Sequence, residues 1–272
     1  MKLVASAKIS NSNSESRLRF TTTGGGSWKV WDRYLALDER QLVHLGNVCG
    51  TCEFFFRHIA EPPLDGCDLD AVRGQLERGL ENLEPVIDKF RSVLPNGEFV
   101  ACLFEGSLAK AGSSKTCPDY FSAEQSEVWA RDAQETVTGL SDYYRGDSVG
   151  IAETEKLFEF VVPLVSRERL QSSRVEHYVR LLESGAKPTA VAISVLDVKS
   201  SMDWPEDDHG NEIEPEYPTH WCFAHYLIDG HHKVAAAAES GQMISVLSFI
   251  ALEPSWLQVD DLLEKYKAGL RP

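Results

Sequence analysis

An apolar segment, a glycine turn and an alanine-rich segment follow one another over residues 221–242, and this succession constrains the fold of the chain most strongly. The apolar run predicts a strand over 221–228. The alanine run predicts a helix over 234–240, with Gly241 directly behind it. Asp229-Gly230-His231-His232-Lys233 lies between the two elements. The sequence therefore predicts a strand that turns directly into a helix.

The residues of this turn are of the types that bind anions. A helix N-terminus offers unpaired N–H groups and a partial positive charge, and Gly230 lets an anion approach the backbone closely. His231, His232 and Lys233 place further donors in the first turn, which favours a bound phosphate. Asp229 could cap the helix or hold a metal beside the phosphates. An ordinary Asp-Gly turn with surface histidines is the alternative.

The turn also resembles a known family. Asp-Gly-His-His-Lys between an apolar strand and an alanine-rich helix is similar to the Asp-Gly-His-His-Arg box of the ParB/sulfiredoxin superfamily, especially its free serine kinase branch. The resemblance covers roughly residues 157–255, and includes the strand at 163–165, the helix at 175–185 and Lys187-Pro188. It implies a mixed α/β domain in the C-terminal half. Residues 1–150 are not covered.

The resemblance implies a nucleotide site. Carried over residue by residue, Gly230, His231, His232 and Lys233 bind the phosphates and Asp229 supports them. The implied cofactor is ATP or ADP with Mg²⁺. Lys233 stands where the family usually has Arg, and Lys binds phosphate as a point charge rather than bidentately. The box contains no cysteine, so repair of sulfinic acids is not implied.

Transfer of a phosphoryl group to a hydroxyl needs a general base. The serine kinases place a glutamate ahead of the helix, where this chain has Gln171 or Ser172. Glu168 and Glu176 lie nearby in the sequence. The candidate catalytic residues are therefore Glu168, Glu176 and His231, with surface carboxylates as the alternative reading of both glutamates.

Cys49-Gly-Thr-Cys52 is a second motif. The CxxC spacing lets both sulfurs reach one metal ion or each other. Cys49, Cys52, His58 and Cys67 supply enough ligands for zinc, although in no recognised zinc spacing. The phenylalanines at 54–56 also suit a segment buried in the core. Core cysteines, a metal site and a redox pair stay open as alternatives.

The net charge of −15 argues against a broad nucleic-acid surface, which needs clustered Lys and Arg. No apolar run approaches the roughly 18 residues of a membrane span, and the first residues lack the apolar region of a signal peptide. We therefore expect a cytoplasmic protein with reduced thiols that binds no membrane.

The apolar spacing predicts two α+β domains. Apolar residues at three- and four-residue steps predict N-terminal helices over 39–60, 68–93 and 122–144. Residues 1–150 are therefore expected to form a mainly helical domain with a few strands, which contains the CxxC helix. Residues 151–272 are expected to form the ParB/sulfiredoxin-like domain, with an acidic insertion at 199–219.

These observations predict a nucleotide-dependent phosphotransferase or nucleotide hydrolase with phosphates at the 229–233 turn. Its partners would be a nucleotide and a small polar acceptor, and a homodimer is compatible with the sequence. One alternative is a non-catalytic protein that senses a nucleotide or another anion. A CxxC metal or redox protein is the other.

Overall fold

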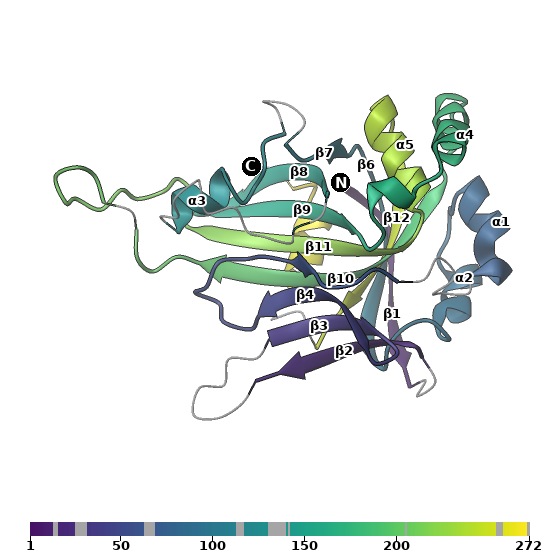
Figure 1. Cartoon of the computed structure of the whole chain (residues 1–272), viewed down its shortest axis with the longest axis horizontal. Coiled ribbons are helices and arrows are strands. Elements are labelled where there is room, and N and C mark those ends of the chain that lie inside the picture. Colours follow the sequence, from purple (N-terminus) through teal and green to yellow (C-terminus); the bar gives the residue numbers. More distant parts are fainter. Residues whose placement is uncertain are drawn as a thin grey trace.

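Two β-sheets and the helices around them form the structure, a computed structural model (Figure 1). It describes residues 1–12, 16–24, 32–62, 69–112, 117–129, 140, 142–204, 206–253 and 258–270. The larger sheet has the order β1 (Lys2–Asn11), β6 (Gly97–Gly106), β12 (Ile244–Ala251), β10 (Thr189–Ser200), β11 (Thr219–Asp229), β9 (Glu155–Pro163), β8 (Tyr144–Ala152) and β7 (Ala109–Lys110). The smaller sheet has the order β2 (Leu18–Thr23), β3 (Asp32–Leu37), β4 (Arg40–Asn47) and β5 (Arg57–His58).

The large sheet is buried on both faces. Alternate residues of β6 point to opposite sides, as the pleat requires. Phe99 and Leu103 join the core shared with the small sheet, α1 (Asp70–Arg78), α2 (Glu84–Ile87) and the 3₁₀ helix η1 (Asp88–Phe90). Val100 and Phe104 join the core under α4 (Ser172–Glu183), α5 (His231–Ser240) and α6 (Val259–Lys267). Two short helices, α3 (Glu124–Val128) and η2 (Arg167–Arg169), complete the fold.

The predicted fold class is wrong for the N-terminal half. Strands make up 41% of the structure and helices 24%, and no mainly helical N-terminal domain is seen among the described residues. Residues 39–60, predicted as the CxxC helix, form β4, a turn and β5. Gly46 has a φ of +80°, which a helix does not accept. The apolar spacing of three and four arises because both faces of β4 are buried.

The other two predicted N-terminal helices are also shorter than expected. Residues 68–93 break into α1, α2 and η1 because Gly79 ends α1 with a φ of +96°. Pro85 then lies in the first turn of α2, where its missing N–H leaves no helical bond unmade. Of residues 122–144, Glu124–Val128 are helical and Tyr144 begins β8, while 130–139 lie outside the described residues.

The C-terminal helices predicted above and the strand before the turn are confirmed. The strand expected over 221–228 is β11, and the helices expected at 175–185 and 234–240 are α4 and α5, whereas the strand expected at 163–165 is the end of β9, whose last residue is Pro163. The acidic residues predicted as an insertion connect β10 to β11, which are antiparallel (Figure 1). In the large sheet, β12, β10, β11 and β9 from the C-terminal half are flanked by β1 and β6 on one side and by β8 and β7 on the other, and residue 150 lies inside β8.

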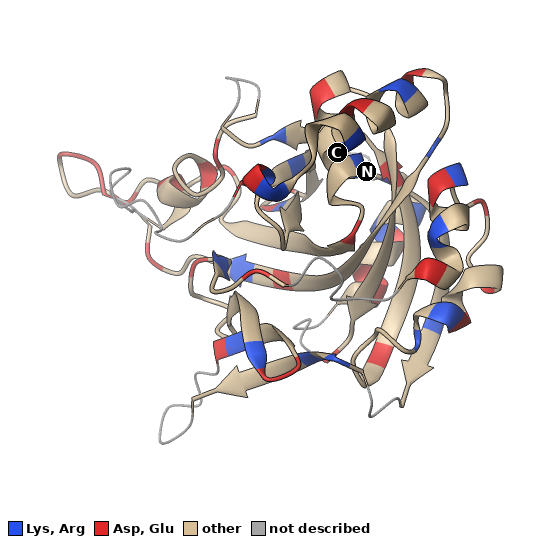
Figure 2. Ribbon diagram, turned by 45° about the vertical axis from the view of Figure 1, so that its right-hand side comes forward, with Lys and Arg blue, Asp and Glu red and all other residues tan. Residues whose placement is uncertain are grey.

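Acidic and basic residues are intermingled on the helices, as Figure 2 shows for α1 and α4. None of the helices in the described ranges is long and apolar enough to cross a membrane.

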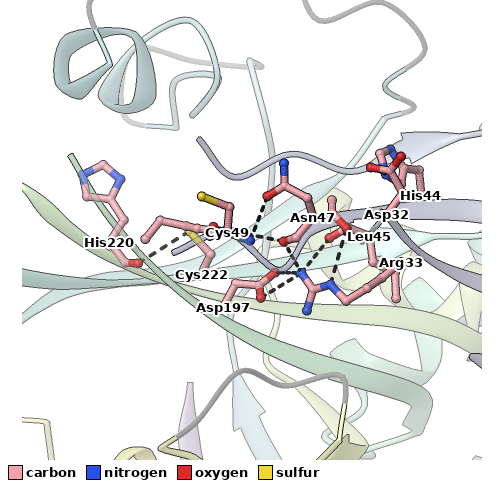
Figure 3. Close-up of polar contacts among 11 residues, drawn as sticks. Asp32, Arg33, His44, Leu45, Asn47, Cys49, Asp197, His220 and Cys222 are labelled. Carbon is pink, nitrogen blue, oxygen red and sulfur yellow. Dashed lines mark hydrogen bonds and ion pairs between the residues drawn. The ribbon is translucent and has the colours of Figure 1, made fainter. Parts of the chain in front are cut away.

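A buried ion pair joins the two sheets. Arg33 on β3 donates to both carboxylate oxygens of Asp197 on β10, at 2.9 and 2.7 Å, and the side chains are 3% and 2% exposed (Figure 3). The same guanidinium donates to the carbonyls of Leu45 and Asn47 on β4. These contacts fix the small sheet against the large one.

Two buried histidines predict a loss of stability in acid. Burial lowers the pKa of His220 to about 4 and that of His225 to about 3. His220 Nδ1 lies 2.8 Å from the hydroxyl of Tyr120, and His225 Nδ1 lies 2.8 Å from that of Ser194. Both stay neutral in the folded protein while the unfolded chain takes up protons below pH 6.5. Their contribution to stability is therefore present above pH 6.5 and is lost as the pH falls towards 4.

Each of the two histidines is expected to lower the free energy of unfolding by up to about 1.4 kcal/mol per pH unit between pH 6 and 5. Urea unfolding across this range measures the slope. His225→Leu should reduce the slope by about one proton, whatever it does to stability at pH 7. An unchanged slope in His225→Leu would show that His225 is protonated in the folded state.

Candidate functional site

The predicted anion turn lies where β11 meets α5. Asp229 ends the strand, Gly230 has a φ of +91°, and His231 begins the helix. A Cβ on Gly230 would lie 2.7 Å from the Cβ of Ala190 and 2.8 Å from its Cα. Glycine is therefore required both by the backbone angle and by the contact with β10. The turn is held directly against the large sheet.

A cleft of about 400 Å³ opens beside this turn, at the end of the sheet where α1, α4 and α5 meet. Figure 1 shows α4 and α5 side by side there. The charged residues that line the cleft are Asp70, Arg73, Glu77, Arg169, Arg174, Asp229 and Lys233. The first residues of α5 also line it, and their N–H groups have no partner within the helix. Its volume suits a small molecule.

Two of the arginines in the cleft are partly neutralised by carboxylates. Arg73 lies 2.6 Å from Asp70, and Arg169 lies 2.5 Å from Glu61. Arg174, in the first turn of α4, is exposed and lowers the pKa values of His232 and Lys233 through its charge, in addition to the larger effect of burial. The cleft therefore brings three arginines to the first turn of α5 alongside three carboxylates, although the whole chain is acidic.

Lys233 points back into the protein. Its side chain is 3% exposed, and its Nζ donates to the carbonyl of Thr189 at 2.8 Å. The same Nζ lies 3.4 Å from Asp229 Oδ2. Burial lowers the pKa of Lys233, which the carboxylate of Asp229 opposes. Lys233 thus connects α5 to the first residue of β10 through a hydrogen bond, and its buried ammonium neutralises the charge of Asp229.

Both histidines of the turn accept hydrogen bonds from the main chain. His231 Nε2 accepts from the N–H of Leu164 at 3.2 Å, and His232 Nε2 accepts from the N–H of Gln171 at 3.1 Å. Burial lowers the pKa of His231 to about 4 and also lowers that of His232. An imidazole that accepts at Nε2 while neutral carries its proton on Nδ1. The pair fastens the first turn of α5 to the β9–α4 connection.

The two candidate glutamates are separated. Glu168 and His231 both line a neighbouring cavity of about 210 Å³, together with Arg167. Glu176 lies on the exposed side of α4, away from the residues that line either cavity. The structure therefore brings Glu168 near the turn and leaves Glu176 outside the site.

Sequence reasoning missed three charged residues in the cleft. Arg73 and Glu77 come from α1, more than 150 residues before the turn, so no local motif connects them with it. Arg174 lies directly before the helix predicted at 175–185, and its charged side chain ahead of an apolar run was the one usable signal.

The CxxC motif lies elsewhere in the fold. Cys49 and Cys52 occupy the turn after β4, and His58 lies on β5. Cys67 lies outside the described residues. Within the described part of the chain, no three His, Cys, Asp or Glu side chains come together as a metal site. Of the residues predicted for zinc, the described Cys49, Cys52 and His58 therefore do not form such a group.

The resemblance of the turn to the ParB/sulfiredoxin box stays a prediction from the sequence. Comparison of this chain with models of protein families, with curated proteins and with solved structures found no match.

Proposed function

We propose that the chain is a nucleotide-dependent phosphotransferase or nucleotide hydrolase, with the nucleotide phosphates bound at the first turn of α5. One observation carries the proposal: the N-terminus of α5 and three arginines line a 400 Å³ cleft that also holds, besides Asp70 paired with Arg73, two further carboxylates. N–H groups at a helix N-terminus together with arginine side chains bind phosphate. The two further carboxylates are those of Asp229 and Glu77.

The carboxylate of Asp229 fits a metal ligand. It is 41% exposed at the end of β11 and lies beside the α5 N-terminus, where the phosphates would be. Mg²⁺ takes one or two carboxylates together with phosphate oxygens, and neutralises phosphate charge during transfer. Glu77 is half-buried in the cleft, 3.4 Å from the hydroxyl of Tyr178. It is placed to accept a proton from a small polar acceptor.

A specific observation supports a non-catalytic sensor as the second candidate. The side chains of His231, His232 and Lys233 all bond to the main chain. Anion binding then depends on backbone N–H groups and on the arginines of neighbouring helices. Such a site holds an anion, and its occupancy stiffens the contact between α4 and α5.

Arg174→Ala is expected to weaken the binding of ATP, ADP and CTP with Mg²⁺ roughly tenfold, the loss typical of one charge-assisted hydrogen bond. Calorimetric titration measures this change. Arg180→Ala is the matched control, because Arg180 lies on another side of the same helix and does not line the cleft. Equal affinities for wild type and Arg174→Ala would place the phosphates elsewhere.

Turnover separates the enzyme from the sensor. Phosphate release or transfer to an added polyol is measured with wild type, Asp229→Asn and Glu77→Gln. An enzyme loses turnover in these variants while it still binds nucleotide. A sensor binds nucleotide and shows no turnover even as the wild type.

A further inference from the structure

The CxxC turn is held rigidly at the end of β10 that lies farthest from the cleft. Its first three carbonyls each accept a hydrogen bond from another part of the fold. Cys49 O accepts from the Nζ of Lys199 at 2.6 Å, and Gly50 O accepts from the N–H of Ser200 at 2.8 Å. Thr51 O accepts from the indole of Trp129 at 3.3 Å. The backbone of the turn is therefore fixed before any reaction of its sulfurs.

Additional contacts hold Cys49 in place. Its N–H donates to the side-chain oxygen of Asn47 at 3.1 Å (Figure 3). Lys199 Nζ also donates to the Asn47 carbonyl. Lys199 itself is 3% exposed. The charge of this buried ammonium lowers the pKa of Cys52, against the larger effect of burial.

Both sulfurs remain accessible. Cys49 and Cys52 are half-buried, and their side chains hydrogen-bond to each other. The Sγ of Cys49 also lies 3.2 Å from the hydroxyl of Thr51. The hydrogen bonds from Cys52 and Thr51 lower the pKa of Cys49 to about 7, while burial and the neighbouring Cys49 raise that of Cys52. Near neutral pH, the thiolate of Cys49 thus lies beside the thiol of Cys52.

The other described cysteines have the opposite environment. Cys102, Cys117 and Cys222 are buried, and burial raises the pKa of each thiol, for Cys102 to about 12. A thiol of this kind reacts slowly because the thiolate is the nucleophile. Among the cysteines that the structure describes, Cys49 in the CxxC turn is therefore the one whose thiol pKa is lowered.

We propose that Cys49 and Cys52 form a reversible dithiol–disulfide couple that exchanges with small disulfides of the glutathione type, with Cys49 as the attacking sulfur. The Cys49 thiolate attacks one sulfur of the small disulfide, which forms a mixed disulfide and releases one small thiolate. Cys52 then loses its proton to water and attacks Cys49 Sγ. The Cys49–Cys52 bond forms and a second small thiolate leaves. Two electrons pass from the protein to the small disulfide.

The test equilibrates the whole chain with mixtures of reduced and oxidised glutathione, then blocks free thiols by alkylation and maps the peptides by mass spectrometry. The expected product is a disulfide between Cys49 and Cys52, with Cys102, Cys117 and Cys222 alkylated. In Cys52→Ser, a mixed disulfide of glutathione with Cys49 should accumulate. Full alkylation of Cys49 and Cys52 under oxidising mixtures, or a bond from either one to Cys67, overturns the proposal.

A second measurement addresses the attacking sulfur and needs no oxidation. The rate of Cys49 alkylation is followed against pH and should have a midpoint near pH 7. Thr51→Val removes the hydroxyl at nearly constant volume and should move the midpoint upward, whereas Thr51→Ser should keep it. A midpoint that stays the same in Thr51→Val contradicts the assignment. Nucleotide binding is independent of these variants, so neither result depends on the proposed function.

Discussion

Asp197→Ala is expected to lower the free energy of unfolding by about 3–5 kcal/mol, the loss typical of removing one partner of a buried ion pair. The carboxylate is 2% exposed and bridges the two sheets through Arg33. Its removal leaves two buried cations, Arg33 and Lys199, near one another. Urea unfolding at neutral pH measures the change.

Two variants identify the cause of this loss. Asp38→Ala removes the carboxylate of the Arg17–Asp38 pair, whose side chains are 52% and 55% exposed, and should change stability far less. Arg33→Met combined with Asp197→Leu replaces both charges by apolar groups and should recover much of the loss. Equal effects of Asp197→Ala and Asp38→Ala would show that burial of the pair does not determine its contribution.

Gly230→Ala is expected to lower the free energy of unfolding by about 2–5 kcal/mol. A left-handed backbone costs an alanine about 1–2 kcal/mol, and overpacking in a filled core costs about 1–3 kcal/mol. The second cost arises because the new methyl would lie 2.7 Å from Ala190, on a strand that cannot move away. The first turn of α5 must shift, so ATP binding should also fall by roughly tenfold or more.

Gly241→Ala provides the matched control at the other end of the same helix. Gly241 has a φ of +66°, and a Cβ there would meet nothing within 4 Å. It should lose only the backbone part, about 1–2 kcal/mol, and keep nucleotide affinity. If both alanines cost the same, the contact between Gly230 and β10 contributes nothing to stability.

The C-terminal elements were predictable because each has one dominant local pattern. The helix α4 has a single apolar stripe and ends at a glycine, and β10 and β11 are continuous apolar runs. Such patterns specify an element without knowledge of its partners.

The N-terminal strands were not predictable in this way. In β4, Leu42, Val43 and Leu45 are all buried because the strand is covered on both faces. A strand of this kind loses the two-residue alternation and matches helical spacing by chance. Gly46 was the one local sign against a helix.

Only the local part of the site was predictable from the sequence, for a related reason. The turn at 229–233 is local, so its residues were found together. Arg73 and Glu77 reach the cleft only because β10 and α1 pack together, a contact between residues more than 100 positions apart. The bonds that turn His231 and Lys233 inward also come from distant main chain, which no motif records.

The position of β12 has a consequence for synthesis of the chain. This strand comes from residues 244–251 yet lies between β6 and β10, in the interior of the large sheet. While it is still inside the ribosome, β6 and β10 each present a long apolar edge with unpaired N–H and C=O groups. Open edges of this kind pair with other chains. The nascent protein should therefore depend on chaperones until β12 has emerged, and termination before this strand should yield aggregates rather than a stable fragment.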